Sequence, residues 1–168
     1  EKIKNKIQKI KKKYSYILSG ESLNINEIIN KLLKSENDNK NNFFKDNFTL
    51  KINVKKTYVD KENTIKNLKG YLVFNDNQIT NANLESKFSN NKKVKFTVKS
   101  SNDEKITTFF SEYPKPLVKR YKFIKGFDKG VLDFYSVKKD NISNSVLIID
   151  NFKLKEVPVL AKILTLAS

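Results

Sequence analysis

The side chains able to do chemistry in this chain are carboxylates, lysines and tyrosines, because the sequence contains neither cysteine nor histidine. Zinc sites of the Cys/His kind, cysteine nucleophiles and Ser-His-Asp triads are therefore excluded. Asp103 and Glu104 are adjacent carboxylates that could suggest acid–base work. Sequence neighbours at a helix start are more often capping charges favoured by the helix dipole. We therefore expect no enzymatic activity, no metal and no cofactor.

A second candidate group lies at residues 115–129, KPLVKRYKFIKGFDK, where cations are interleaved with aromatic rings. Stacking combined with phosphate contact would suit single-stranded nucleic acid. The same mixture would suit anionic headgroups at a membrane surface. A third interpretation, which we favour, is a solvated strand edge that lysines protect from aggregation. The candidate headgroup contacts are Lys119, Arg120, Lys122 and Lys125.

The net charge of +16 by itself favours an anionic partner such as nucleic acid. However, Arg120 is the only arginine among 34 basic residues, whereas nucleic-acid sites favour arginine for its bidentate contacts. The abundant lysine, asparagine, isoleucine and phenylalanine all have adenine- and thymine-rich codons. We therefore favour drift in a low-GC genome over function as the explanation of the positive charge.

The elements that must position these residues are mostly strands. Periodicity predicts one short amphipathic helix at residues 24–34, NINEIINKLLK, capped by Asn24. From residue 48 onward the period changes to two, which predicts a meander of antiparallel strands with a turn at residues 75–77. A second short helix is expected at residues 103–112, ended by Pro114. Strands then resume at residues 130–138 and 143–154.

Each predicted strand has one apolar face, and these faces must be buried against something. A closed core, a layer of helices and bound lipid are the three possibilities. The apolar-face residues, which are the candidates for facing a lipid groove, are Phe48, Leu50, Ile52, Val54, Leu72, Phe74, Leu84, Phe88, Phe96, Val98, Val146, Ile148, Phe152 and Leu154. Taken without any family resemblance, the alternation favours an ordinary β-sandwich core.

The chain closes with an apolar segment, VPVLAKILTLAS. Pro158 fits the first turn of a helix, and apolar side chains cover nearly its whole circumference. At about 1.5 Å per residue this helix is too short to cross a bilayer. We expect it to pack into the end of the apolar trough and to narrow or cap it through Pro158, Leu160, Ile163 and Leu164.

Four segments in order resemble the AsmA-like proteins of Gram-negative envelopes, most closely the YhdP type. The close, NFKLKEVPVLAKILTLAS, resembles that family's strand, Pro-x-Leu helix and final Leu-x-x-Ser. LSGESLNINEII at residues 18–29 resembles its Gly-x-x-Leu-Asp segment, with Asn24 where Asp is usual. SSNDEKITTFFSEY at residues 100–113 and FDKGVLDFYS at residues 127–136 resemble two further family segments, although Lys129 replaces the first of two paired glycines.

This resemblance implies a mainly β (α+β) fold, in which a curved antiparallel sheet forms a groove accompanied by two or three short helices. It implies that residues 1–168 are one domain of a longer periplasmic protein anchored in the inner membrane. Such proteins conduct phospholipid acyl chains along an apolar groove between the inner and outer membranes, and they are not enzymes. The expected partner is phospholipid, with no nucleic acid.

The alternative function is a basic module that binds nucleic acid or an anionic surface. Salt separates the two hypotheses, because nucleic-acid affinity falls steeply with added salt whereas burial of acyl chains does not weaken. An acyl chain gains about 0.8 kcal/mol for each methylene removed from water, wherever it sits along an apolar surface. Such a surface would therefore act as a conduit along which a lipid slides at little cost.

Overall fold

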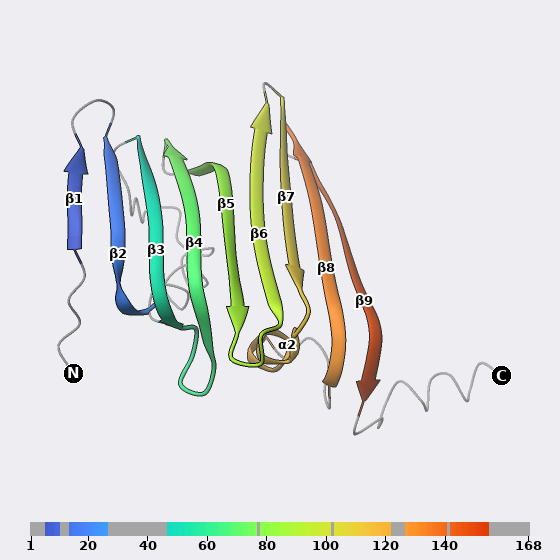
Figure 1. Ribbon diagram of the computed structural model, residues 1–168. Coiled ribbons are helices and arrows are strands. Elements are labelled where there is room, and N and C mark those ends of the chain that lie inside the picture. The colour runs from blue at the N-terminus through green and yellow to red at the C-terminus, as the bar shows by residue number, and fades with distance from the viewer. Residues whose placement is uncertain are drawn as a thin grey trace.

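The computed structural model describes residues 6–10, 14–26, 47–76, 78–101, 103–121, 127–140 and 142–154. These residues form one open sheet of nine strands, arranged side by side in chain order (Figure 1). The chain is therefore mostly β, as predicted, with little helix in the part described. The elements are β1 (Lys6–Ile10), β2 (Ser15–Asn24), β3 (Phe48–Tyr58), β4 (Thr64–Asn75), β5 (Gln78–Phe88), β6 (Lys93–Ser101), β7 (Glu104–Ser111), α2 (Lys115–Tyr121), β8 (Phe127–Lys139) and β9 (Ile142–Leu154).

One strand pair departs from the antiparallel sheet that the resemblance implies. β2 and β3 are parallel, with Leu18 opposite Ile52, and every other neighbouring pair is antiparallel. A parallel pair requires a connection of about a dozen residues or more. Residues 25–47 provide that length here, whereas the turns between later strands are short. The sheet is therefore mixed.

The tight turns use the residues that tolerate a left-handed backbone. Asp76 between β4 and β5 has φ 48°, Asn91 between β5 and β6 has φ 63°, and Asp140 between β8 and β9 has φ 52°. Short polar side chains such as Asp and Asn adopt this conformation at low cost. The predicted turn at residues 75–77 is confirmed by Asp76.

The predicted helix at residues 103–112 is wrong, because these residues form β7, paired on both sides by β6 and β8. Thr107, Thr108, Phe109 and Phe110 are β-branched or aromatic and fit a pleated surface better than a helix. The helix begins later, at Lys115, after Pro114, whose carbonyl accepts the N–H groups of residues 117 and 118 at 2.9 Å each. The adjacent carboxylates Asp103 and Glu104 therefore lie at a β-turn and a strand start.

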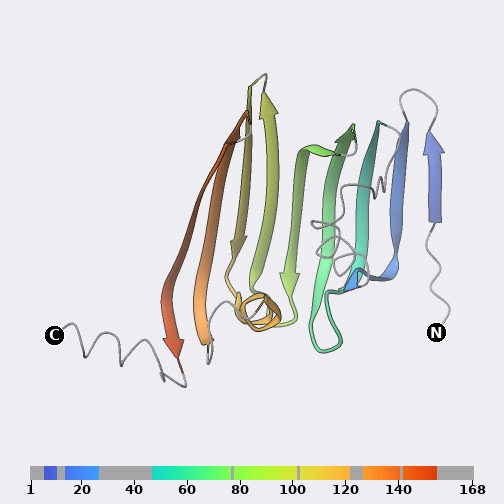
Figure 2. The same ribbon diagram turned by 180° about the vertical axis from the view of Figure 1, so that it is seen from behind.

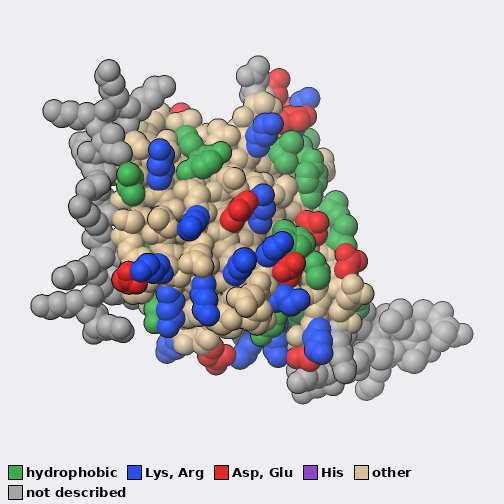
Figure 3. All heavy atoms as spheres, in the orientation of Figure 1, with side chains coloured by type: hydrophobic (Ala, Val, Ile, Leu, Met, Phe, Trp, Pro, Cys, Tyr) green, Lys and Arg blue, Asp and Glu red, His purple; other side chains and the backbone are tan. Residues whose placement is uncertain are grey.

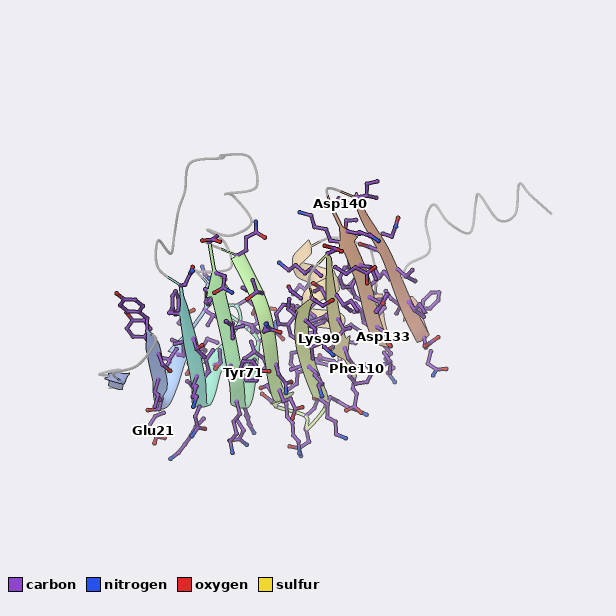
Figure 4. The ribbon with its side chains drawn as sticks, turned by 90° about the horizontal axis from the view of Figure 1, so that it is seen from above. Glu21, Tyr71, Lys99, Phe110, Asp133 and Asp140 are labelled. Atoms are coloured by element: carbon purple, nitrogen blue, oxygen red, sulfur yellow. The ribbon has the colours of Figure 1, made fainter. Side chains whose placement is uncertain are left out.

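The sheet has two chemically distinct faces. α2 packs against one of them (Figures 2 and 4), which we call the helix face; it carries Val54, Phe88 and Leu132. We call the opposite face the lysine face, because its exposed side chains include Lys51, Lys69, Lys95 and Lys99. Glu21, Tyr71 and Phe110 also lie on the side away from α2 (Figure 4).

Two apolar clusters pack on the helix face. The larger joins Ile52, Val54, Ile65, Leu68 and Phe88, and residues from β2 and from two loops cover it, among them Leu18, Leu23, Val59 and Tyr113. The smaller joins Val118 of α2 to Phe127 and Leu132 of β8. Lys115 at the start of α2 also pairs with Asp128 at 2.8 Å, so α2 is held to β8 by both packing and charge.

Two predicted helices lie wholly or mainly outside the described residues. Of the first, at residues 24–34, the structure describes the start, where the Asn24 side-chain oxygen accepts the N–H of Asn26 at 3.0 Å, as a cap does. The closing segment, with Pro158, Leu160, Ile163 and Leu164, lies outside. Within the described ranges no helix has the length and apolar character needed to span a bilayer.

Candidate functional site

A continuous apolar row crosses the helix face at right angles to the strands. Each member lies directly opposite the next on the neighbouring strand, from β2 to β9. At about 4.8 Å between strands, the row is about 34 Å long. We call it the apolar row, and its members are Leu18, Ile52, Gly70, Leu84, Phe96, Phe109, Phe134 and Leu147.

One side chain of the row is buried and the others are partly or largely accessible. Ile52 is 8% exposed, within the larger cluster, and Leu147 is 48% exposed. The half-buried members are Leu18, Leu84, Phe96, Phe109 and Phe134, of which Phe109 and Phe134 also pack against the smaller cluster. Gly70 sits where β4 and β5 approach closely, since a Cβ there would overlap the carbonyl oxygen of Asn83. Apolar surface that a ligand could complete therefore lies over β6–β9.

The ten predicted groove residues of β3–β6 all lie on the helix face, but their burial differs. Five are core residues that the protein itself covers: Ile52, Val54, Phe74, Phe88 and Val98. Five are half-buried: Phe48, Leu50, Leu72, Leu84 and Phe96. Phe48 and Phe74 stack at 4.7 Å between ring centroids, and Tyr16 packs edge-on against Phe48 at 5.4 Å. These rings close the end of the sheet over β2–β4.

The predicted face of β9 is wrong for two residues. Val146 and Ile148 lie opposite Tyr135 and Asp133, on the lysine face, and are 55% and 51% exposed. Residues 146–149 are apolar at every position, so alternation does not choose a face and pairing with β8 does. The helix-face residues of β9 are instead Leu147 and Ile149, opposite Phe134 and Leu132.

The last two groove candidates follow a break in the alternation. Asn151 has φ 51°, and the pairing with β8 shifts register on either side of Lys129. Phe152 is 54% exposed beyond this break. The backbone of Leu154 pairs with Phe127, and its side chain lies outside the described residues.

The predicted headgroup contacts at residues 119–125 are not brought together by what the structure describes. Lys119 ion-pairs with Glu62 at 2.9 Å, with both side chains about 70% exposed (70% and 72%). Such exposed pairs contribute about 0–1 kcal/mol. Arg120 lies in α2, but its side chain is outside the described set, as are Lys122 and Lys125 entirely. The expected strand edge here is in part helix α2.

Polarity rises stepwise along β7 and β8, away from α2. Two residues beyond the apolar row lie Thr107 and Ser136, and the Ser136 hydroxyl bonds those of Ser143 at 3.1 Å and Ser145 at 2.8 Å. Two residues further, Lys105 and Lys138 face each other across the strands. We call Thr107, Ser136 and Ser145 the hydroxyl row, and we call Lys105 and Lys138 the lysine pair.

The lysine pair is electrostatically unfavourable in the protein alone. Burial lowers the pKa of Lys105, and the charge of Lys138 lowers it further. Among the described residues neither lysine forms an ion pair with a carboxylate. Sequence analysis missed these two residues because residues 103–112 were assigned to a helix, which hid their shared face. For β8, the sequence signal was the alternation of Leu132, Phe134 and Ser136, which places Lys138 on the same face.

The lysine face carries a second candidate surface. Lysines spread over its centre and hydrophobic side chains gather at the β8–β9 side (Figure 3). A cleft of about 680 Å³ over β4–β7 on this face is lined by Lys69, Lys87, Lys93 and Lys95 together with Phe110. One of these cations is already neutralised, since Lys95 pairs with Glu85 at 2.9 Å.

The described residues contain no group of three or more acidic or other metal-binding side chains placed to hold an ion. The arrangement that remains is an amphipathic surface, with an apolar row, a hydroxyl row and a lysine pair on one face. No protein-family model, curated protein or solved structure matches the chain.

Proposed function

We propose that this chain is a non-catalytic segment of a periplasmic lipid-transport protein of the AsmA-like, YhdP type. In this proposal the sheet curves into a groove whose helix face conducts phospholipid acyl chains between the inner and outer membranes. The parent protein is anchored in the inner membrane. The observation that carries the proposal is the apolar row, because it crosses eight strands with Gly70 as its one member without a side chain and stays partly exposed over β6–β9.

The direction of the row fits a conduit better than a binding pocket. An acyl chain that spans half of a hydrocarbon core of about 30 Å could lie along the row, which is longer than that half-thickness. Each buried methylene contributes about 0.8 kcal/mol at any position along it. The row itself offers no side-chain hydrogen bond that would hold the chain at one place.

A single introduced tryptophan tests this proposal, because the chain contains none of its own. Phe109→Trp places the indole in the apolar row, and Lys99→Trp places it on the lysine face as the matched control. Phosphatidylcholine with brominated acyl chains should quench the fluorescence of Phe109→Trp and leave that of Lys99→Trp unchanged. Equal quenching of both variants, or of neither, would reject the proposal; Phe96→Trp serves as a second reporter in the same row.

A second candidate function, binding of an anionic surface or nucleic acid, is favoured by the lysine-lined cleft on the other face. This candidate predicts a steep loss of affinity between about 50 and 200 mM salt. Quenching of Phe109→Trp by brominated phosphatidylcholine should instead persist or strengthen over that range. A substitution of Lys69 and Lys87 by Gln should affect the second function alone.

A further inference from the structure

The lysine pair lies at one end of the helix face of β7 and β8, where cations replace apolar and hydroxyl side chains. Across these four strands the last row reads Ser100, Lys105, Lys138 and Ser143, each opposite the next. Register partners on antiparallel strands hold their Cβ atoms about 5 Å apart. Two ammonium groups can therefore converge on a single anion.

The spacing from the lysine pair to the apolar row matches an amphiphile. Lys105 and Phe109 are four positions apart, as are Phe134 and Lys138, and four positions span about 13 Å along an extended strand. The hydroxyl row lies between, with Thr107, Ser136 and Ser145. A ligand laid along β7 and β8 would thus meet charge, then hydrogen-bonding groups, then hydrocarbon.

We propose that Lys105 and Lys138 bind the phosphate of an anionic phospholipid whose acyl chains lie on the apolar row. This inference rests on the proposed function and adds to it the position and charge class of the headgroup. The phosphate accepts charge-assisted hydrogen bonds from both ammonium groups, while the ester region lies against the hydroxyl row.

The energetics of the free protein support this assignment. Lys105 is half-buried and faces the like charge of the exposed Lys138, which destabilises the fold, and the lowered pKa of Lys105 reports both burial and this charge. Locally unfavourable arrangements such as these opposed like charges are expected at functional sites. An anion between the two ammonium groups would remove the repulsion. Four positions from the apolar row toward the same edge of the sheet, β3 and β4 carry the stacked Phe48 and Phe74 in place of cations.

The test measures headgroup preference in the Phe109→Trp background. We expect brominated phosphatidylglycerol to half-saturate the quenching at about tenfold lower concentration than brominated phosphatidylcholine. The double substitution Lys105→Gln with Lys138→Gln should abolish this preference and leave binding of phosphatidylcholine intact. The matched control, Lys95→Gln with Lys99→Gln, removes the same charge from the lysine face and should keep the preference.

Four results would overturn the inference. Equal affinity for the two lipids would reject the headgroup site while leaving the proposed function standing, whereas no quenching by either lipid would reject the proposed function. Loss of preference in the Lys95/Lys99 control would assign it to overall charge. Glycerol phosphate should compete only weakly, because it lacks the acyl chains; competition as strong as that of the lipid would indicate a site for free phosphate.

Discussion

At the scale of single residues, the buried hydroxyl of Thr57 is an unusual feature of the larger apolar cluster. Thr57 is fully buried, and its Oγ1 has no hydrogen-bond partner among the described residues. Thr57→Val removes the unsatisfied group at nearly constant shape, so we expect the free energy of unfolding in urea to rise by about 1 kcal/mol. Thr97→Val loses the 2.6 Å hydrogen bond to the Thr108 hydroxyl, so its free energy of unfolding should fall by a similar amount. A loss of stability in Thr57→Val would contradict this account.

Lys105 gives a prediction that depends on pH. Its pKa is lowered below the ordinary value of 10.5, first by burial and then by Lys138, so the folded state disfavours its charged form. The resulting penalty is present at neutral pH and is relieved as pH rises through the lowered pKa towards 10.5. Lys105→Met should therefore unfold at higher urea than the unaltered chain at neutral pH, and the gap should close as pH approaches 10.5. A gap that widens with pH would contradict the assignment, and Lys99→Met is the exposed control.

At the scale of elements, the close approach of β4 and β5 depends on Gly70. Its φ of 137° is rarely adopted by other residues, and a Cβ would overlap the Asn83 carbonyl oxygen. We expect Gly70→Ala to lower the free energy of unfolding by about 3 kcal/mol or more. Gly130→Ala has a similar φ of 148° but meets its nearest atoms at 3.1 Å, so its loss should be smaller. Equal losses in urea unfolding would show that the overlap is relieved by movement of β5.

Strand β9 lies at one edge of the described sheet and exposes apolar side chains there. It carries no charge from Ile142 to Ile149, and Val146, Leu147 and Ile148 are each about half-exposed. Edge strands usually carry charges that oppose pairing with another chain. Ile148→Lys should therefore reduce self-association, measured by sedimentation at rising protein concentration, without changing the urea midpoint appreciably. An unchanged sedimentation profile would mean that this edge does not mediate association.

At this scale the sequence predicted where the strands lie better than it predicted which strands pair and in which register. The alternation of residues 48–54 placed β3 correctly because one parity is apolar and the other polar. In β9 both parities are apolar at residues 146–149, so the face depended on the register with β8. The parallel pair of β2 and β3 and the strand β7 are tertiary outcomes, since local propensity alone does not determine which strand becomes a neighbour.

At the scale of the whole molecule, the candidate site follows from the register of many strands together. The apolar row joins residues from position 18 to position 147, and no sequence motif predicts it. Leu18, Ile52 and Leu84 pack into or against the larger cluster. The members over β6–β9 remain partly exposed, although Phe109 and Phe134 also pack against the smaller cluster. The sequence indicated the residue types of the row, but the division into core and accessible surface required the packing of Leu23, Val59 and Tyr113.

The central claim is that hydrocarbon contacts the helix face of this sheet and not the lysine face. Photo-crosslinking in cells from Phe96 and Phe134, compared with Lys95 and Lys99, tests it most directly because Phe96 lies between the two lysines on β6. We predict phospholipid adducts at Phe96 and Phe134 and none at the two lysine positions. Equal labelling of both faces, or adducts at the lysine positions alone, would contradict the account.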